Sequence, residues 1–165
     1  ITAGGLAGVS RALAALTQLL IPRPMAPSSS GSAAAEAEAH VRRRHFFVLP
    51  PVSIEDSPRF PWRGVMVDVC RHFMPLSLLR RVLDAMATLR FNTLHLHLSD
   101  DQGLRVRLDS LPGSAGRGAS DGHFYTPDEL RALVSYAAAR SIRVVPEIDI
   151  PGHSTALIAA TRASG

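Results

Sequence analysis

Residues 92–103 read Asn-Thr-Leu-His-Leu-His-Leu-Ser-Asp-Asp-Gln-Gly and contain the clearest strand pattern in the chain. Three leucines alternate with two histidines here, and successive side chains of a β-strand point to opposite faces of the sheet. We therefore predict a strand over residues 93–98, with one aliphatic face and one face that carries His95 and His97. The strand runs into a cluster of polar residues that begins with Ser99.

Two further strands are predicted, one on each side of this one in the sequence. Residues 64–69 are nearly all apolar, which is typical of a strand buried on both faces, and residues 142–148 form the third strand. Helices are predicted over residues 75–90 and 126–140, and from residue 154 onward. The first has apolar residues at helical spacing, and the second begins with a Thr-Pro-Asp-Glu capping sequence.

This order of alternating strands and helices predicts an α/β protein with a parallel sheet. Such units build either an open doubly wound sheet or a (β/α)₈ barrel. Three units do not close a barrel, so a barrel requires further strands after residue 165. The chain starts with Ile1 rather than Met and stops just after a predicted helix start, so we expect it to be truncated at both ends.

The composition excludes several classes of protein. Of 165 residues, 46% are hydrophobic and 19% are charged, a balance that excludes wholesale disorder. No apolar stretch is long enough for a transmembrane helix. The formal net charge is +4, but the arginines are scattered, which does not favour nucleic-acid binding. No glycine-rich phosphate loop follows a strand, so nucleotide binding is not supported.

The N-terminal third differs from the rest of the chain. Leucines at helical spacing within residues 1–20 predict a helix there. Residues 21–57 are predicted to be a linker or insertion, because their proline- and serine-rich part buries little apolar surface. We expect Arg42–Arg44 at the solvated edge of this segment, and Phe46 and Phe47 in the core.

Polar clusters follow all three predicted strands, at the edge where parallel folds carry their functional residues. Each cluster has a structural alternative: Asp68 as a turn or cap residue, Arg71 as a bridge to a nearby carboxylate, and the Asp100–Asp101 pair as a turn. Three clusters at three consecutive strand ends together predict an active-site rim. The clusters are Asp68–His72, Ser99–Gly103 and Glu147–His153.

Three residues near this edge have open interpretations. His95 and His97 are either core histidines with satisfied hydrogen bonds or a pair that holds a metal such as zinc. Cys70, the one cysteine, has no neighbouring histidine motif and is interpreted as a small buried residue rather than a nucleophile.

Several motifs resemble, in the same order, those of glycoside hydrolase family 20, the β-N-acetylhexosaminidases. The resemblance implies that residues 58–165 are the N-terminal part of the catalytic (β/α)₈ barrel, its first three βα units. Residues 1–20 more loosely resemble the end of the small α/β accessory domain that precedes this barrel. The matching motifs are Phe60–Gly64, Asp68–Phe73, Asn92–Gly103, Tyr125–Thr126, Pro146–Asp149 and Pro151–His153.

The resemblance implies a retaining exo-glycosidase that removes terminal N-acetylglucosamine or N-acetylgalactosamine from glycans without a cofactor or metal. In this family the acetamido oxygen of the sugar is the nucleophile, assisted by an Asp-Glu pair on the fourth strand. We expect the sequence to end before that strand, and Glu55-Asp56 does not match the pair, because it has the reverse order and precedes the barrel. The family also implies a lysosomal, extracellular or periplasmic location.

The resemblance also implies roles for single residues. Arg71 matches the arginine that binds hydroxyls of the terminal sugar, and its planar fork suits two adjacent oxygens. Asp100 and His153 match a relay to the general acid, and Asp149 matches a further carboxylate near that histidine. Leu104 stands where the family often has Trp, so we expect a local change in packing.

Two rival hypotheses remain at this stage. One is a metal-dependent barrel hydrolase that uses His95 and His97 with a carboxylate. The other is a non-catalytic, truncated carbohydrate-binding protein.

Overall fold

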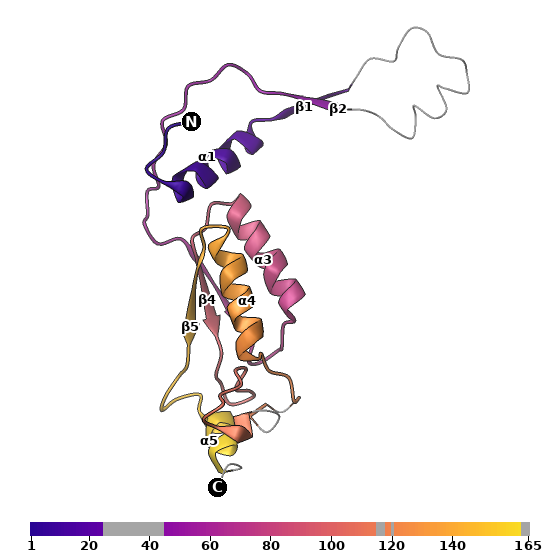
Figure 1. Ribbon diagram of the computed structural model, residues 1–165, viewed down its shortest axis with the longest axis vertical. Coiled ribbons are helices and arrows are strands. Elements are labelled where there is room, and N and C mark those ends of the chain that lie inside the picture. Colours follow the sequence, from indigo (N-terminus) through magenta and orange to yellow (C-terminus); the bar gives the residue numbers. More distant parts are fainter. Residues whose placement is uncertain (25–44, 115–117, 120, 163–165) are drawn as a thin grey trace, which may run out of the picture.

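The computed structural model describes residues 1–24, 45–114, 118–119 and 121–162. A three-stranded sheet with its helices forms the larger part, and a helix and a hairpin precede it (Figure 1). In chain order the elements are α1 (Leu6–Gln18), β1 (Ile21–Pro24), β2 (His45–Val48), β3 (Gly64–Asp68), α3 (Leu76–Thr88), β4 (Thr93–His97), the 3₁₀ turn η1 (Pro112–Ser114), α4 (Pro127–Ala138), β5 (Arg143–Glu147) and α5 (Thr155–Arg162).

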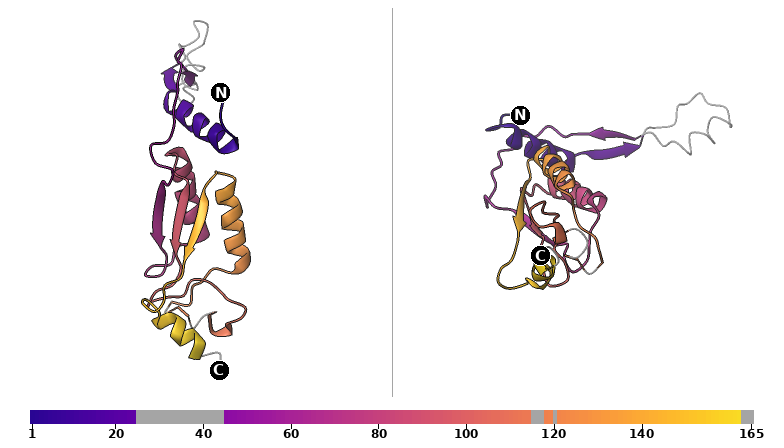
Figure 2. Two further views of the ribbon diagram at one scale, coloured as in Figure 1. Left: turned by 90° about the vertical axis from the view of Figure 1, so that its left-hand side faces the viewer. Right: turned by 60° about the horizontal axis from the view of Figure 1, so that its bottom comes forward.

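Strands β3, β4 and β5 form a parallel sheet in that order (Figure 2). Their registers place Asp68 opposite His97 and His97 opposite Glu147, so the last residues of the three strands lie in one row. This confirms the predicted α/β class with a parallel sheet. The polar clusters that follow the strands therefore meet at one edge, as predicted.

The core lies between the sheet and the two helices that connect its strands. Right-handed crossovers place α3 and α4 on the same face of a parallel sheet. The aliphatic face of β4 packs there, and burial of each leucine contributes about 1.5–3 kcal/mol. Buried core residues include Val67, Leu79, Leu83, Met86, Leu94, Leu96, Leu133 and Ala137.

The prediction that the first strand is buried on both faces was wrong. Val67 faces the helices and is 9% exposed, whereas Met66 is 55% exposed on the opposite face. His95 lies on that second face of the sheet as well, opposite Met66 in the register. Because both connecting helices lie on one side, the described residues leave the other side of the sheet open.

Helix α4 begins with the capping box that the sequence predicted. The Thr126 hydroxyl accepts from the backbone N–H of Glu129, and the Glu129 carboxylate accepts from the backbone N–H of Thr126. Pro127 occupies the first helical position, where its missing N–H costs nothing. Local side chains therefore set where this helix starts.

The N-terminal segment lies beyond the amino-terminal ends of the three parallel strands, away from the polar clusters (Figures 1 and 2). Helix α1 contacts α3, and Arg11 on α1 donates from Nη2 to the Ser141 carbonyl at 2.8 Å. The predicted linker contains two antiparallel strands, β1 and β2, which the sequence analysis did not expect. Most of that linker, including Arg42–Arg44, lies outside the described residues.

Phe46 and Phe47 are not core residues, contrary to the prediction. They are 49% and 62% exposed on β2. Strands β1 and β2 extend away from α1 and from the three-stranded sheet (Figure 1). Within the described ranges, no helix is long and apolar enough to cross a membrane.

Candidate active site

The site begins with the row of residues that ends the three strands. Asp68, His97 and Glu147 lie side by side in the register of β3, β4 and β5. The loops that follow β4 and β5 add Asp100 and His153 to this row through hydrogen bonds. The strands thus position one end of the network, and short loops position the other.

His97 links two carboxylates from different elements. Its Nδ1 lies 2.9 Å from Glu147 Oε2, and its Nε2 lies 2.9 Å from Asp100 Oδ2. Burial lowers the pKa of His97, but its hydrogen bonds to Asp100 and Glu147 outweigh burial and raise the pKa above its usual value. The ring therefore favours the doubly protonated form, which donates to both carboxylates.

Asp100 is the most buried carboxylate of the network, with 1% of its surface exposed. Its Oδ2 accepts from His97 and pairs with Arg71 Nη2 at 2.5 Å, and its Oδ1 accepts from the Asp101 backbone N–H at 2.6 Å. Burial raises the pKa of Asp100, but these hydrogen bonds and the Arg71 charge outweigh it and lower the pKa. Asp100 is therefore an oriented carboxylate ion at neutral pH.

Arg71 lies in the loop after β3 and bridges two carboxylates. Its Nη1 contacts Asp68 Oδ2 at 2.6 Å, and its Nη2 contacts Asp100. Asp68 also accepts backbone N–H bonds from Cys70 and Arg71, so it forms the turn that was its structural alternative. The Arg71 side chain is 43% exposed, so part of the guanidinium faces solvent.

His153 approaches Asp100 from the loop after β5. Its Nδ1 lies 3.2 Å from Asp100 Oδ1, which fits a donated N–H and leaves Nε2 on the far side of the ring. His153 has a φ of 52°, a left-handed backbone conformation that residues other than glycine seldom adopt. The side chain is 48% exposed. Asp100 thus orients a half-exposed imidazole at the edge of the sheet.

Asp149 lies close to His97 and Glu147. A carboxylate oxygen of Asp149 lies within 4.8 Å of ligand-type atoms of His97 and Glu147. Its backbone N–H donates to Ser99 Oγ at 2.8 Å. The structure therefore places Asp149 beside the buried end of the network, whereas His153 contacts Asp100.

Arg105 is a buried cation that the sequence analysis did not single out. It is 1% exposed and donates to the carbonyl groups of Val69, Cys70 and His123. Its guanidinium also contacts both carboxylate oxygens of Asp121, at 2.5 and 3.0 Å. Arg105 therefore fastens the loop after β3 to the loop that leads to α4.

Gly103 packs against Arg105, and the next residue, Leu104, packs against α5. A Cβ on Gly103 would lie 2.8 Å from Arg105 Cζ, closer than real Cβ contacts, so the close approach requires glycine. Leu104 is fully buried and packs against Ala156 and Ala160. Leu104 therefore joins this loop to α5.

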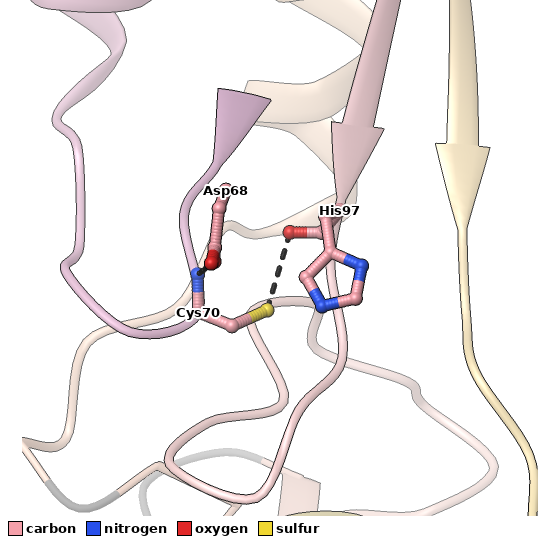
Figure 3. Close-up of side chains that lie close together, drawn as sticks. All are labelled: Asp68, Cys70 and His97. Carbon is pink, nitrogen blue, oxygen red and sulfur yellow. Dashed lines mark hydrogen bonds between the residues drawn. The ribbon is translucent and has the colours of Figure 1, made fainter. Parts of the chain in front are cut away.

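Cys70 is buried among these loops (Figure 3). Its Sγ donates to the His97 carbonyl at 3.1 Å, and its backbone N–H donates to Asp68 Oδ1 at 2.9 Å. Burial raises the pKa of the Cys70 thiol to about 12, so the thiol stays protonated at neutral pH. This agrees with the prediction of a small buried residue rather than a nucleophile.

Metal binding was the other interpretation of the two histidines. Both ring nitrogens of His97 already pair with carboxylates, and His95 Nε2 contacts Glu147 Oε2 at 2.7 Å. His97 thus fits a satisfied core histidine, whereas His95 is 37% exposed. Ligand-type atoms lie within 4.8 Å of one another in three groups of described residues: Asp68–Cys70–His97, His97–Glu147–Asp149 and Asp100–Asp101–His153.

Comparison with known proteins identifies the family. Residues 60–165 match the family model described as "Glycosyl hydrolase family 20, catalytic domain". The chain belongs to glycosyl hydrolase family 20. It is 44% identical over 130 residues to a β-hexosaminidase of Vibrio furnissii, an overlap of 68% of this chain and 21% of that protein.

Further family 20 proteins show the same similarity. The chain is 48% identical over 123 residues to a β-N-acetylhexosaminidase of Cellulomonas fimi, an overlap of 71% of this chain and 24% of that one. A solved structure of a family 20 β-N-acetylglucosaminidase superimposes with a TM-score of 0.76 and 41% identity, over 98% of this chain and 30% of that chain. The chain thus spans about a fifth to a quarter of the length of these curated relatives.

Two residues of this hydrogen-bonded network were not predicted as catalytic or binding residues. Glu147 was grouped with a polar cluster but given no role, and His97 was interpreted as core or metal-binding. The parallel register brings them together although they are 50 residues apart, and no local motif encodes that contact. Alternation on the strand did predict that His97 lies on the face opposite the leucines.

Proposed function

We propose that the protein is a β-N-acetylhexosaminidase that hydrolyses terminal non-reducing N-acetylhexosamine residues of glycans. In this proposal residues 58–165 supply the first three βα units of a (β/α)₈ barrel, and residues 1–20 are the end of an accessory domain. The observation that carries the proposal is the Arg71–Asp100–His153 contact at the carboxyl edge of the sheet, in a chain of family 20.

The geometry suggests a division of work among these side chains. Asp100 is ionised and accepts from His153 Nδ1, which fixes the tautomer and leaves Nε2 directed away from Asp100. We propose that Nε2 faces the general acid Glu of the Asp-Glu pair expected on the fourth strand. The imidazole would then tune the pKa of that acid as it protonates the leaving oxygen and later accepts a proton from water.

The substrate supplies the nucleophile in this mechanism. The acetamido oxygen of the sugar attacks the anomeric carbon, the bond to the leaving oxygen breaks, and water then opens the cyclic intermediate. We propose that the exposed part of the Arg71 guanidinium binds hydroxyls of the same sugar. Its fork is already oriented by Asp68 and Asp100, so little further ordering is needed.

Hydrolysis by the full-length protein tests the proposal. We expect turnover of aryl N-acetyl-β-glucosaminide or N-acetyl-β-galactosaminide, none of the matching aryl β-glucoside, and no loss of activity with a chelator. The glucoside is the control because it differs from the glucosaminide only in carrying a hydroxyl in place of the acetamido group. Equal turnover of the glucoside would contradict substrate assistance, and loss of activity on chelation would favour the metal-dependent alternative.

A further inference from the structure

Four side chains form a continuous hydrogen-bonded series from the buried row to the exposed edge. The first three members are joined at 2.9 Å: Glu147 Oε2 to His97 Nδ1, and His97 Nε2 to Asp100 Oδ2. Asp100 Oδ1 then contacts His153 Nδ1 at 3.2 Å. The proposed relay uses only Asp100 and His153, so it assigns no role to Glu147 and His97.

His97 can hold both carboxylates only as an imidazolium. An ionised carboxylate accepts hydrogen bonds and donates none, so each ring nitrogen must carry a hydrogen. A neutral ring has one N–H and would leave either Asp100 or Glu147 without its donor. His97 is 4% exposed, so water does not readily replace the missing bond.

The other charged groups around His97 are mostly anionic. Asp68 lies beside it in the register of β3, Asp149 lies beyond the end of β5, and the neutral Cys70 thiol contacts its carbonyl. Arg71 is the cation that contacts Asp100 directly, while His95 contacts Glu147. The carboxylates around His97 carry more negative charge than the Arg71 guanidinium can balance. A positive charge on His97 therefore balances part of the remainder.

We propose that Glu147 and His97 extend the relay inward, with His97 a positioning residue that Glu147 keeps charged and that holds Asp100 as an oriented carboxylate for His153. This inference rests on the proposed function. It adds two residues on the strands themselves to a relay otherwise built on loops. Strand residues hold a fixed geometry, which is what a relay needs to orient a half-exposed imidazole.

The substitution Glu147→Gln in the full-length protein tests this most directly. Glutamine keeps the size of the side chain and can still accept from His97, but it removes the negative charge. We expect kcat to fall about 10- to 100-fold, the usual cost of losing a charged hydrogen-bond partner, with little change in KM. We also expect the alkaline limb of the kcat/KM profile to move to lower pH, since His97 loses its proton more easily.

A double variant separates this role from simple structural support. If Glu147 acts through Asp100 and His153, the Glu147→Gln change should cost little more once His153→Ala has removed the end of the series. The matched control is Asp84→Asn, which removes a carboxylate that accepts from Tyr136 and Arg140 on the helix side. It should lower the melting temperature and leave kcat/KM and the pH profile unchanged.

Two results would overturn the inference: a lowered melting temperature with unchanged kinetics in Glu147→Gln, or a full multiplicative loss in the His153→Ala background. If the wild-type protein hydrolyses no N-acetylhexosaminide, that result contradicts the proposed function. The inference is then decided by ¹⁵N NMR of the histidine rings. Both His97 nitrogens protonated at neutral pH in the wild type, but not in Glu147→Gln, would support it, and a neutral wild-type His97 would reject it.

Discussion

Arg71 connects the part of the site that faces solvent with the part that is buried. One arm of its guanidinium pairs with Asp68 in its own loop, and the other pairs with the buried Asp100. Its pKa is raised, first by the hydrogen bond to Asp68, so it is a permanent cation. The fork is therefore held in one plane by two carboxylates while part of it stays open to a ligand.

Replacing Arg71 by Lys keeps the charge but removes the planar pair of donors. Losing a two-pronged contact to sugar hydroxyls should cost about 1.5–3 kcal/mol, which is about 10- to 150-fold in kcat/KM. The measurement is kcat/KM together with a thermal melt of the same full-length Arg71→Lys protein. Near-normal kinetics with a lowered melt would show that Arg71 only bridges its two carboxylates.

The Arg105–Asp121 pair predicts a pH dependence of stability. The hydrogen bonds from Arg105 lower the pKa of Asp121 from 3.8 to about 2. A carboxyl group with a lowered folded-state pKa stabilises the fold above its unfolded pKa, and this contribution disappears as pH falls toward the folded value. The pair should therefore stabilise the protein above about pH 4 and lose this effect between about pH 4 and pH 2.

Urea unfolding of the full-length Asp121→Asn and wild-type proteins across this pH range checks the sign. The difference in unfolding free energy should be largest near neutral pH and vanish near pH 2. The control is Asp128→Asn, because Asp128 pairs with Arg131 at a side chain that is 89% exposed and should contribute little at any pH. A difference that grows as pH falls would contradict the assigned role of Arg105.

At this scale the sequence predicted the members of the site better than their contacts. Polar residues after each strand indicated the edge, and the family motifs singled out Asp100 and His153, which the structure brings together. The inner contact of His97 with Glu147 depends on the register between two strands, which no local pattern specifies.

Elements whose ends are set by local side chains were predicted well. The Thr126 capping box acts over three residues, so the start of α4 can be recognised from its sequence. The pairing of β1 with β2 was not predicted, because residues 25–44 separate the two strands in the sequence. Neither strand has a clear alternation of polar and apolar residues or a turn signal of its own. The exposed face of β3 was missed because burial depends on which side the helices cover.

Thr126→Ala removes the cap of α4 without touching the core. The Glu129 N–H would lose its acceptor, and the expected loss of unfolding free energy is about 1 kcal/mol. Thr88→Ala is the control, because the Thr88 hydroxyl donates to the Asp84 carbonyl within α3 and does not cap the start of a helix. Chemical denaturation of both variants in the full-length protein checks this, and equal effects of the two would contradict the capping role.

The molecule as a whole has one covered and one open face. Helices α3 and α4 cover one face of the sheet, while Met66 on the other face is 55% exposed. Strands β3 and β5 each pair with β4 alone among the described strands. Open edges and exposed apolar side chains favour association with other chains.

Residues 1–165 produced alone should therefore unfold without a sharp transition and bind a hydrophobic dye. They should also show no measurable hydrolysis of an aryl N-acetylglucosaminide, since the Asp-Glu sequence that they contain, Asp128-Glu129, starts α4 and does not follow a strand. Differential scanning calorimetry and a turnover assay check both statements. A cooperative melt of a monomer would contradict the first, and turnover well above buffer the second.

The central claim is that Asp100 and His153 form the relay of a β-N-acetylhexosaminidase at this edge of the sheet. Neighbouring carboxylates provide a matched test, because Asp100 contacts His153 whereas the Asp101 side chain accepts from the backbone and hydroxyl of Thr155 at the start of α5. The decisive measurement is kcat/KM of the full-length Asp100→Asn and Asp101→Asn proteins on an aryl N-acetyl-β-glucosaminide. We predict a loss of about 10²-fold or more for Asp100→Asn and a few-fold at most for Asp101→Asn. Wild-type activity in a folded Asp100→Asn protein would contradict the account.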